Sequence, residues 1–301
     1  MVLPTYNRAH TVRRAIDSVL SQSYEDFELI VVDDGSTDDT PAVLNSVSDD
    51  RVQSLRFPEN RGANVARNAG IREADGEYIA FQDSDDIWRP SKLELQVAAL
   101  DQAGESVGVV YTGYYRVYDG RKKYGPRGKE TLAGDIHDEL LKGNGWFIPT
   151  AVTAVRQTCF ETVGLFDERL QRLQDWEMWL RLSERYTFEF INKPLIEKHM
   201  RQDEVSIRSD TAAFIDAMEL ILSEYQAKFQ ARTGRLAQHQ RQLGYHYLRD
   251  GRHLRGRLYF LRALRNDCSV VSVAAALAGM AGPGNYRRIK EARRLVNGIL
   301  S

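Results

Sequence analysis

Cysteine and long apolar runs are both scarce in this chain of 301 residues. The only cysteines are Cys159 and Cys268, too few for a disulfide framework, and no Cys-x-x-Cys pair exists to hold zinc. No apolar run reaches the roughly 18 residues that predict a membrane-spanning helix. The opening Met1-Val2-Leu3-Pro4 lacks the apolar stretch of a signal peptide. We therefore expect a protein of the reducing cytoplasm without a transmembrane helix.

The chain as a whole has almost no net charge, but its two parts carry opposite excesses. The formal net charge is -1. Residues 228–301 carry 15 Lys and Arg against 3 Asp and Glu, and residues 1–227 carry the remaining 26 and 39. Hydrophobic residues make up 43% of the chain, which excludes wholesale disorder. The uneven charge predicts two regions with different partners.

The N-terminal third of the chain alternates apolar, β-branched segments with amphipathic ones. We expect strands at residues 2–3, 27–32, 52–57, 78–81 and 107–111. We expect helices at residues 12–20, 38–47, 62–74 and 90–100. Such alternation is typical of an α/β protein with a mostly parallel central sheet and helices on both faces.

The pattern changes after Thr112. Asp119-Gly120 lies between two aromatic-rich segments and predicts a hairpin at residues 114–124. We expect a strand at 150–155 and helices at 135–142, 157–163 and 175–186. Strand signals disappear from residue 204 onward. The expected helices there lie at 209–230, 235–249, 254–265 and 284–298, with an apolar segment at 270–281.

Three polar clusters follow expected strands. They are Thr5-Tyr6-Asn7-Arg8, Asp33-Asp34-Gly35-Ser36 and Asp83-Ser84-Asp85-Asp86. Ligands of open α/β sheets bind at the carboxyl ends of the strands, so all three clusters should line one edge of the sheet. Neither a G-x-G-x-x-G fingerprint nor a P-loop follows a strand, which excludes those two kinds of nucleotide site.

The third cluster has the clearest chemistry. In extended backbone Asp83 and Asp85 point the same way, whereas Ser84 turns away. Two adjacent carboxylates repel each other unless a cation or a proton neutralises them. A hard divalent ion such as Mn²⁺ or Mg²⁺ binds carboxylate oxygen and leaves positions open for phosphate. The alternative is an acidic loop that caps the next helix, with Asp86 taking part, and an isolated Asp-x-Asp favours that alternative.

The order and spacing of motifs over residues 1–205 resemble those of family 2 glycosyltransferases. The motifs are Pro4-Thr5-Tyr6-Asn7-Arg8, Leu20-Ser21-Gln22, Asp33-Asp34-Gly35-Ser36-Thr37-Asp38, Asn60-Arg61-Gly62, Ala66-Arg67-Asn68-Ala69-Gly70, Gly76-Glu77-Tyr78-Ile79, Asp83-Ser84-Asp85-Asp86, Gly164-Leu165-Phe166-Asp167-Glu168 and Gln174-Asp175-Trp176-Glu177-Met178-Trp179-Leu180-Arg181. Each motif alone is weakly specific, but the combination is highly specific. Only Met1, Val2 and Leu3 precede the first motif, where family members have several more strand residues, so we expect a short first strand.

The resemblance implies a GT-A domain at residues 1–203, with a nucleotide-binding part at 1–111 and an acceptor part at 112–203. A basic helical extension follows at residues 204–301. The implied activity is that of an inverting glycosyltransferase of hexosyl type. It would move a sugar from a nucleotide donor, expected to be UDP-linked, to a hydroxyl of a glycan or lipid-linked acceptor, with Mn²⁺ or Mg²⁺ on the diphosphate.

The resemblance also implies roles for individual residues. The residues expected to bind the nucleotide are Pro4, Thr5, Tyr6, Asp34, Arg67, Asp83 and Ser84. Asp34 would hold the uracil with the Pro4-Thr5-Tyr6 segment, Asp83 would approach the ribose, and Asp85 would be the protein ligand of the metal. Arg67 would meet the diphosphate, or pair instead with a carboxylate of the sheet edge.

Asp175 would be the catalytic base. Glu177 is the rival, but positions i and i+2 of a helix face different ways, so only one of the two can point into the site. Trp176 and Trp179 would give the base apolar surroundings, which raise a carboxyl pKa toward neutrality. His199 would be a further metal or phosphate ligand, or simply a surface residue of a basic loop.

The basic extension admits three readings of its chemistry. Its helices pack together with solvated basic faces, or they bind the surface of a membrane through arginines and apolar residues. Nucleic-acid binding is the third, but no known nucleic-acid motif is present, so we expect no nucleic-acid partner.

Two other functions fit parts of the pattern. A sugar-phosphate nucleotidyltransferase would share metal and diphosphate binding, but it needs a Gly-rich basic loop that Thr5-Tyr6-Asn7-Arg8 does not supply. A nucleotide-sugar-binding protein without turnover would differ only in lacking transfer. The donor sugar, the acceptor, the linkage and the oligomeric state cannot be deduced from these residues.

Overall fold

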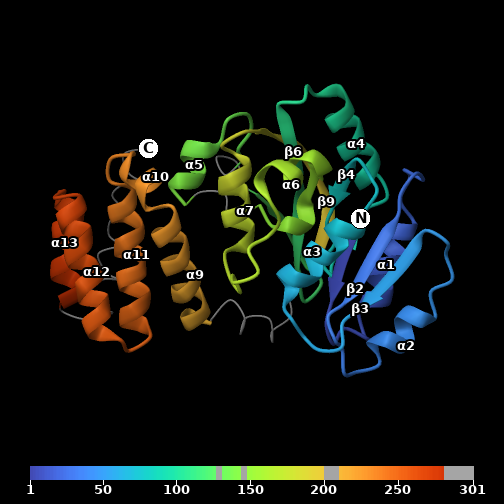
Figure 1. Cartoon of the computed structure of the whole chain (residues 1–301), viewed down its shortest axis with the longest axis horizontal. Coiled ribbons are helices and arrows are strands. Elements are labelled where there is room, and N and C mark those ends of the chain that lie inside the picture. The colour runs from blue at the N-terminus through green and yellow to red at the C-terminus, as the bar shows by residue number, and fades with distance from the viewer. Residues whose placement is uncertain (127–130, 144–147, 200–209, 281–301) are drawn as a thin grey trace. The chain divides into compact units, whose positions relative to one another are not determined.

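A computed structural model describes residues 1–126, 131–143, 148–199 and 210–280 of the chain. The chain divides into two compact units, Met1–Glu204 and Val205–Ser301. The first unit contains all the strands of the described residues together with α1 to α7, and the second contains α9 to α13 (Figure 1).

A three-stranded parallel sheet opens the first unit. It consists of β1 (Val2–Thr5), β2 (Leu29–Asp33) and β3 (Val52–Arg56). The connecting helices are α1 (Val12–Leu20), α2 (Thr40–Asn45) and α3 (Ala63–Glu73). Every residue of the central strand β2 is buried, as its β-branched sequence predicts for a strand covered on both faces. The first strand is short, as expected.

A second sheet has the order β4-β8-β6-β9-β5, and β7 pairs with β6. Its strands are β4 (Tyr78–Ala80), β5 (Ile87–Trp88), β6 (Val107–Tyr118), β7 (Arg121–Gly125), β8 (Thr153–Arg156) and β9 (Thr187–His199). A parallel bridge between Val2 and Phe81 connects the two sheets.

The predicted α/β class is confirmed, but the strand pairing needs a correction. Parallel pairing holds in the first sheet and between β6 and β9. The other four pairs of the second sheet are antiparallel. Only β6 and β7 are joined by a direct reversal of the chain, without the helical crossover that a parallel pair needs. The other three antiparallel pairs join strands that are distant in sequence.

The remaining helices of the first unit are α4 (Lys92–Gln102), α5 (His137–Leu141), α6 (Gln157–Val163) and α7 (Gln174–Leu182), with a short 3₁₀ turn at Thr150–Val152. Two tryptophans of α7 anchor it in the core. Trp176 donates its indole N–H to the Leu140 carbonyl at 2.9 Å, and Trp179 donates to the Ile148 carbonyl at 2.9 Å. Both side chains are fully buried.

One long strand escaped the sequence prediction. β9 covers residues 187–199, a segment that the sequence analysis expected to end in a basic loop around His199. Its apolar alternation is interrupted by Asn192-Lys193-Pro194, which coincides with register shifts opposite Thr112 and Gly113 of β6. Such an irregularity hides a strand from a search for strict alternation.

The second unit consists of α9 (Thr211–Glu224), α10 (Gln226–Gln230), α11 (Arg235–Arg249), α12 (His253–Asn266) and α13 (Val270–Met280). α11 and α12 pack closely at Gly244 and Gly256, because a Cβ on Gly256 would lie only 2.8 Å from the Gly244 carbonyl oxygen. The expected helix at 209–230 is two helices, and the apolar segment at 270–281 forms α13. The expected helix at 284–298 lies outside the described residues.

No helix within the described ranges combines the length and the apolar character needed to cross a bilayer.

Candidate active site

The three polar clusters meet at one edge of the first unit. Thr5 and Asp33 are register partners at the ends of β1 and β2. The third cluster joins them through the backbone, since Gln82 donates its N–H to the Val2 carbonyl at 3.0 Å. Arg8 of the first cluster lies 3.6 Å from the Asp85 carboxylate of the third. The expectation that the carboxyl ends of the strands gather these clusters is therefore confirmed.

The first two clusters interlock around Asn7. Its side-chain oxygen accepts the Thr37 N–H at 2.8 Å, and its own N–H donates to the Ser36 hydroxyl at 2.9 Å. Asn7 adopts a positive φ of 51°, a conformation that asparagine tolerates better than most residues. This turn leaves the neighbouring Tyr6 ring 42% exposed, while the Thr5 hydroxyl is buried and without a hydrogen-bond partner among the described residues. Pro4 lies within β1, partly buried.

Asp34 has a partner that the sequence did not reveal. Its two carboxylate oxygens accept the backbone N–H groups of Arg61 at 2.7 Å and Gly62 at 2.9 Å. Gly62 is the residue before α3 and has a φ of 100°, which a side chain would strain. Asp34 is 3% exposed. It therefore fixes the start of α3, the helix that carries Arg67.

In the acidic cluster, one carboxylate oxygen from each of Asp83, Asp85 and Asp86 lies within 4.8 Å of the others. Ser84 between them is buried. The expected convergence of Asp83 and Asp85 is present, and Asp86 joins them instead of capping the next helix alone.

A cation faces each of these carboxylates. Lys198 Nζ lies 3.0 Å from Asp83 and 2.6 Å from Asp86. A guanidinium nitrogen of Arg67 lies 3.5 Å from Asp83. The sequence analysis expected Arg67 either to meet the diphosphate or to pair with a carboxylate of the sheet edge, and the structure shows the ion pair with Asp83. The sequence analysis missed Lys198, because it placed this residue in a surface loop, whereas β9 places it in the site.

The electrostatics follow from this packing. Burial opposes ionisation of Asp83, but the Lys198 ammonium and the Arg67 guanidinium outweigh burial and lower its pKa. Burial likewise opposes the charged form of Lys198, but Asp86 and Asp83 outweigh it and raise the pKa of Lys198. Burial raises the pKa of Asp86 to about 8; the Lys198 ammonium opposes this shift, and the charges of Asp83 and Asp85 add to it. The Lys198–Asp83 pair is therefore charged near neutral pH, whereas Asp86 is the carboxyl of the cluster that retains a proton most readily.

The residues present fit a divalent metal ion. Three carboxylates supply the hard oxygen ligands that Mg²⁺ and Mn²⁺ prefer. His199 Nε2 is buried without a hydrogen-bond partner in the described structure, and the Asp85 charge reaches it. Burial, and then the positive charge of Arg14, lower the pKa of His199, which keeps the imidazole in the neutral form that metals bind.

Asp175 lies in the first turn of α7 and contacts Thr150. The Thr150 hydroxyl donates to Asp175 Oδ1, and the Thr150 N–H lies 3.4 Å from Oδ2. Burial raises the pKa of Asp175, the Arg67 guanidinium partly offsets this, and the Asp83 charge adds to it. Arg67 and Asp83 are thus within electrostatic reach of Asp175. Sequence reasoning missed Thr150, since no local signal connects it to a residue of α7.

Glu177 faces elsewhere. Arg181 holds it in a two-pronged ion pair, with N–O distances of 2.7 and 2.8 Å. The same guanidinium donates to the Val163 carbonyl at 2.7 Å, so the pair connects α7 to the end of α6. Of the two candidate carboxylates on α7, it is therefore Asp175 that lies near the acidic cluster.

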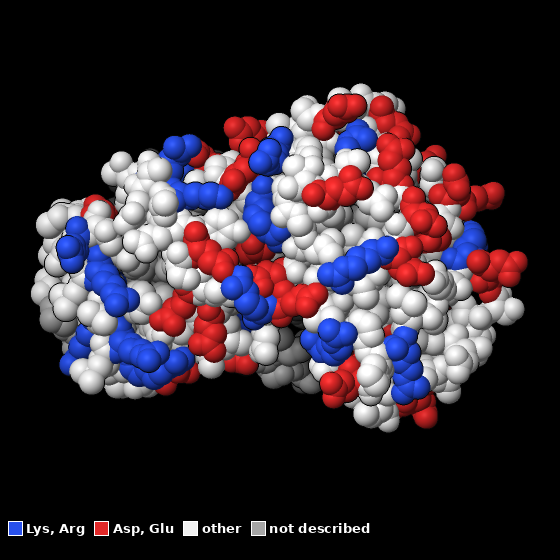
Figure 2. Space-filling model, viewed as in Figure 1, with Lys and Arg blue, Asp and Glu red and all other residues white. Residues whose placement is uncertain are grey.

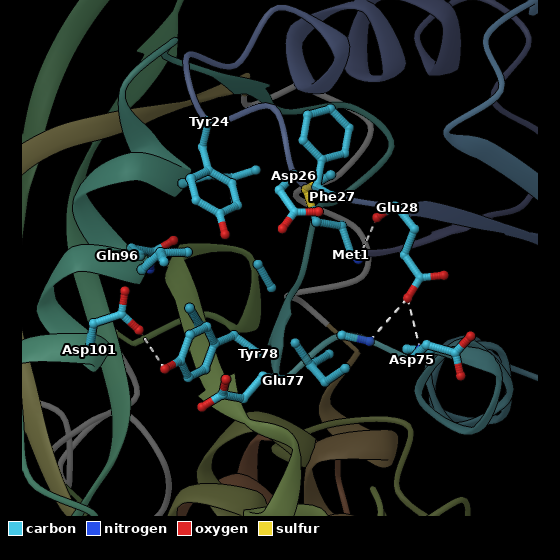
Figure 3. Close-up of a pocket in the computed structure, with 17 residues that line it drawn as sticks. Met1, Tyr24, Asp26, Phe27, Glu28, Asp75, Glu77, Tyr78, Gln96 and Asp101 are labelled. Carbon is cyan, nitrogen blue, oxygen red and sulfur yellow. Dashed lines mark hydrogen bonds between the residues drawn. The ribbon is translucent and has the colours of Figure 1, made fainter.

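A cavity of about 640 Å³ lies at a different place. Its lining includes Met1, Glu28 and Tyr78 (Figure 3), which lie at the amino ends of β1, β2 and β4. None of the site residues expected from the sequence lines it. The cavity is therefore separate from the polar clusters at the carboxyl ends of the same strands.

Comparison with known proteins gives a consistent result. Residues 1–164 match the family described as "Glycosyl transferase family 2". An uncharacterized glycosyltransferase of Nostoc sp. is 34% identical over 64% of this chain and 60% of its own length. The Escherichia coli protein WfgD, described as a UDP-Glc:alpha-D-GlcNAc-diphosphoundecaprenol beta-1,3-glucosyltransferase, is 31% identical over 70% of this chain and 79% of its own length.

The fold is also similar to a solved structure. S. aureus TarS residues 1–349, in complex with UDP-GlcNAc, superposes with a TM-score of 0.71 at 20% identity, covering 98% of this chain and 90% of that one. The chain spans only 60% to 63% of the length of the Nostoc relative and of a Rickettsia prowazekii relative. The family match and the WfgD alignment together place the chain in glycosyl transferase family 2.

Proposed function

We propose that the chain is a metal-dependent, inverting glycosyltransferase that moves a hexose from a UDP-linked donor to a hydroxyl of a glycan or lipid-linked acceptor. The observation that carries the proposal is the position of Arg67, which pairs with Asp83 of the acidic cluster and acts electrostatically on Asp175. The same small region thus offers carboxylates for a metal and a separate carboxylate for a proton. WfgD supports the donor and acceptor classes, since its description names a UDP-sugar and a lipid diphosphate.

The donor side of the proposal uses the strand ends. Asp34 and the Pro4-Thr5-Tyr6 segment hold the uracil, and the exposed Tyr6 ring offers a face for stacking. Asp83 and Ser84 approach the ribose, and Asp85 is the ligand of Mn²⁺ or Mg²⁺. A bound metal supplies Lewis-acid stabilisation of the charge that develops on the leaving diphosphate. Arg67 adds positive charge beside it.

The acceptor side of the proposal uses Asp175 as the base. Inversion requires the acceptor hydroxyl to lose its proton while it attacks the face opposite the leaving group. Burial raises the pKa of Asp175, which brings its basicity closer to the working pH. The two hydrogen bonds from Thr150 hold the carboxylate in one orientation.

The two units divide the work in this proposal. Residues 1–203 form the GT-A domain, with the donor part at 1–111 and the acceptor part at 112–203, and residues 204–301 form a basic extension that binds the cytoplasmic face of a membrane. Leu254, Leu258 and Leu261 lie on one stripe of α12, and Val270, Val273 and Leu277 lie on one stripe of α13, all exposed. On the face shown in Figure 2, Lys and Arg predominate over α11 to α13.

The chemistry of this surface favours an anionic bilayer. A shallow pocket of about 260 Å³ between α12 and α13 is lined by Arg257, Phe260, Leu261 and Ala276. Exposed apolar side chains such as Leu254, Leu258 and Leu261 insert at the lipid interface, while arginines meet anionic headgroups. A membrane contact would bring the enzyme to an acceptor carried on a lipid diphosphate, the acceptor class that the WfgD description names.

The deciding experiment measures turnover. The full chain is incubated with a panel of nucleotide sugars, with and without Mn²⁺, and thermal stabilisation identifies the donor. Transfer or hydrolysis of that donor is then followed as UDP release. Metal-dependent UDP release supports the proposal. Stabilisation without any UDP release would instead favour a nucleotide-sugar-binding protein without turnover.

A further inference from the structure

Lys198 occupies an unusual position for a lysine. Its side chain is only 12% exposed, and its ammonium lies between the carboxylates of Asp83 and Asp86. The position is set by sheet register. β5 pairs with β9 at Ile87 and Glu197, and β6 pairs with β9 at Arg116 and Lys198. Lys198 is therefore built into the site by the backbone and is not a flexible surface group.

The positive charges around the cluster equal or outnumber its negative charges without a metal ion. Asp83, Asp85 and Asp86 supply at most three negative charges, because burial raises the pKa of Asp86 to about 8. Lys198, Arg67 and Arg8 supply three positive charges at distances of 2.6 to 3.6 Å. A divalent ion that enters this arrangement alone adds two uncompensated positive charges beside buried cations, which like-charge repulsion opposes.

The three carboxylates are not equally engaged. Asp83 and Asp86 make ion pairs with Lys198 at hydrogen-bond distance. Among the described residues, the Asp85 carboxylate has only the longer ion pair with Arg8, at 3.6 Å. Lys198 thus leaves Asp85 as the carboxylate whose oxygens are most available to a metal, and the geometry itself selects one ligand out of three.

We propose that Lys198 is a resident cation that makes metal binding conditional on the diphosphate. It pairs with Asp83 and Asp86 in the free protein, so that a divalent ion binds weakly to Asp85 by itself. A nucleoside diphosphate brings the missing negative charge, and metal and nucleotide then bind together. The inference rests on the proposed function for the identity of the anion. Lys198 acts on the metal through charge and is a positioning residue.

The test compares Mn²⁺ affinity with and without UDP. Free Mn²⁺ is titrated with the full chain and followed by electron paramagnetic resonance, first with Mn²⁺ alone and then with saturating UDP. In the wild-type chain we expect UDP to tighten Mn²⁺ binding at least about tenfold. In Lys198→Gln, which removes the charge but still donates a hydrogen bond, we expect Mn²⁺ alone to bind at least about tenfold tighter than in the wild type, with a smaller gain from UDP.

Two matched variants separate charge from folding. Lys198→Arg keeps the charge, and we expect it to bind Mn²⁺ alone as weakly as the wild type. Lys193→Met removes an exposed lysine of the same strand, and we expect no change. Because Lys198→Gln removes a positive charge from the site, it should also weaken binding of the anionic UDP in the absence of metal. Circular dichroism checks that each variant is folded.

The outcomes distinguish the two proposals. If folded Lys198→Gln and the wild type bind Mn²⁺ alone equally, Lys198 is only a structural ion pair and the inference fails. If the wild type binds Mn²⁺ tightly without UDP, the inference also fails, while the glycosyltransferase proposal stands. If no form binds Mn²⁺ even with UDP, the metal assignment to Asp85 is wrong and the inference falls with it.

Discussion

The two units of the chain use charge in opposite ways. In Met1–Glu204 the cations of the site face carboxylates inside the fold, as Lys198 does with Asp83 and Asp86. In Val205–Ser301 many arginines lie on helix surfaces, next to exposed leucines such as Leu254 and Leu261. Enclosed charge pairs define a site for a small, highly charged ligand. An exposed mixture of arginine and leucine suits a broad anionic surface instead.

The largest expected effect tests whether the first unit contains the catalytic site, which the proposal places at Asp175. We predict that Asp175→Asn lowers the rate of sugar transfer by about 10² to 10⁴-fold, because an amide cannot accept the acceptor proton. UDP affinity should stay within about twofold of the wild type, since the residue lies outside the proposed nucleotide contacts. Steady-state kinetics and calorimetric titration with UDP measure the two effects. Transfer at the wild-type rate would remove Asp175 as the base.

The metal assignment predicts a smaller but selective loss. Asp85→Ala should lower UDP affinity in the presence of Mn²⁺ by at least about tenfold, which corresponds to about 1.4 kcal/mol. Affinity without Mn²⁺ should change little, because Asp85 is proposed to bind the nucleotide only through the metal. Titration of UDP with and without Mn²⁺ measures both. If the UDP affinity of Asp85→Ala depends on Mn²⁺ as strongly as that of the wild type, the metal ligand is another carboxylate.

The second unit should respond to a change that leaves the first untouched. We predict that replacing Leu254, Leu258 and Leu261 with serine lowers binding to vesicles of anionic phospholipid at least about tenfold, since each buried leucine contributes about 1.5 to 3 kcal/mol. Transfer to a soluble acceptor should continue at the wild-type rate. Vesicle sedimentation measures the binding, with Lys228→Gln, an exposed residue on another helix, as the control. Equal sedimentation of the triple variant and the wild type would contradict the membrane contact.

The pH profile gives the smallest expected effect. Burial raises the pKa of Asp175 above its ordinary 3.8, and a base works only when deprotonated. We therefore predict that kcat/KM rises with pH through a single ionisation that lies above the ordinary aspartate range. The rising limb should disappear in the residual activity of Asp175→Asn. If kcat/KM rises instead at the ordinary aspartate pKa, burial does not raise the pKa of Asp175.

Much of the first unit could be predicted because its signals are local. The apolar run that became β2, the periodic helix α1 and the alternation of Asp83 and Asp85 each depend on neighbours in sequence. The motifs that follow the strands could be assigned to one edge because parallel strands end together. These features needed no knowledge of distant contacts.

The residues that were missed depend on distant contacts. Lys198 meets Asp83 across 115 positions in the sequence, and the strand that brings it there is interrupted at Asn192-Lys193-Pro194. Thr150 meets Asp175 across 25 positions. The β6–β7 hairpin was predicted from Asp119-Gly120. The other antiparallel pairs of the second sheet were missed, since pairing direction between distant segments is decided by tertiary packing and not by the periodicity of one segment.

Asp34 has a mechanical consequence beyond any contact it makes with a base. Its carboxylate grips the first turn of α3 through Arg61 and Gly62, and the same helix carries Arg67 to the acidic cluster. A ligand that displaces Asp34 would therefore also displace α3 and, with it, the guanidinium of Arg67. In the proposed function, binding of the base at Asp34 would be linked through α3 to the position of Arg67 beside the diphosphate, so that a poorly held base would also misplace the guanidinium.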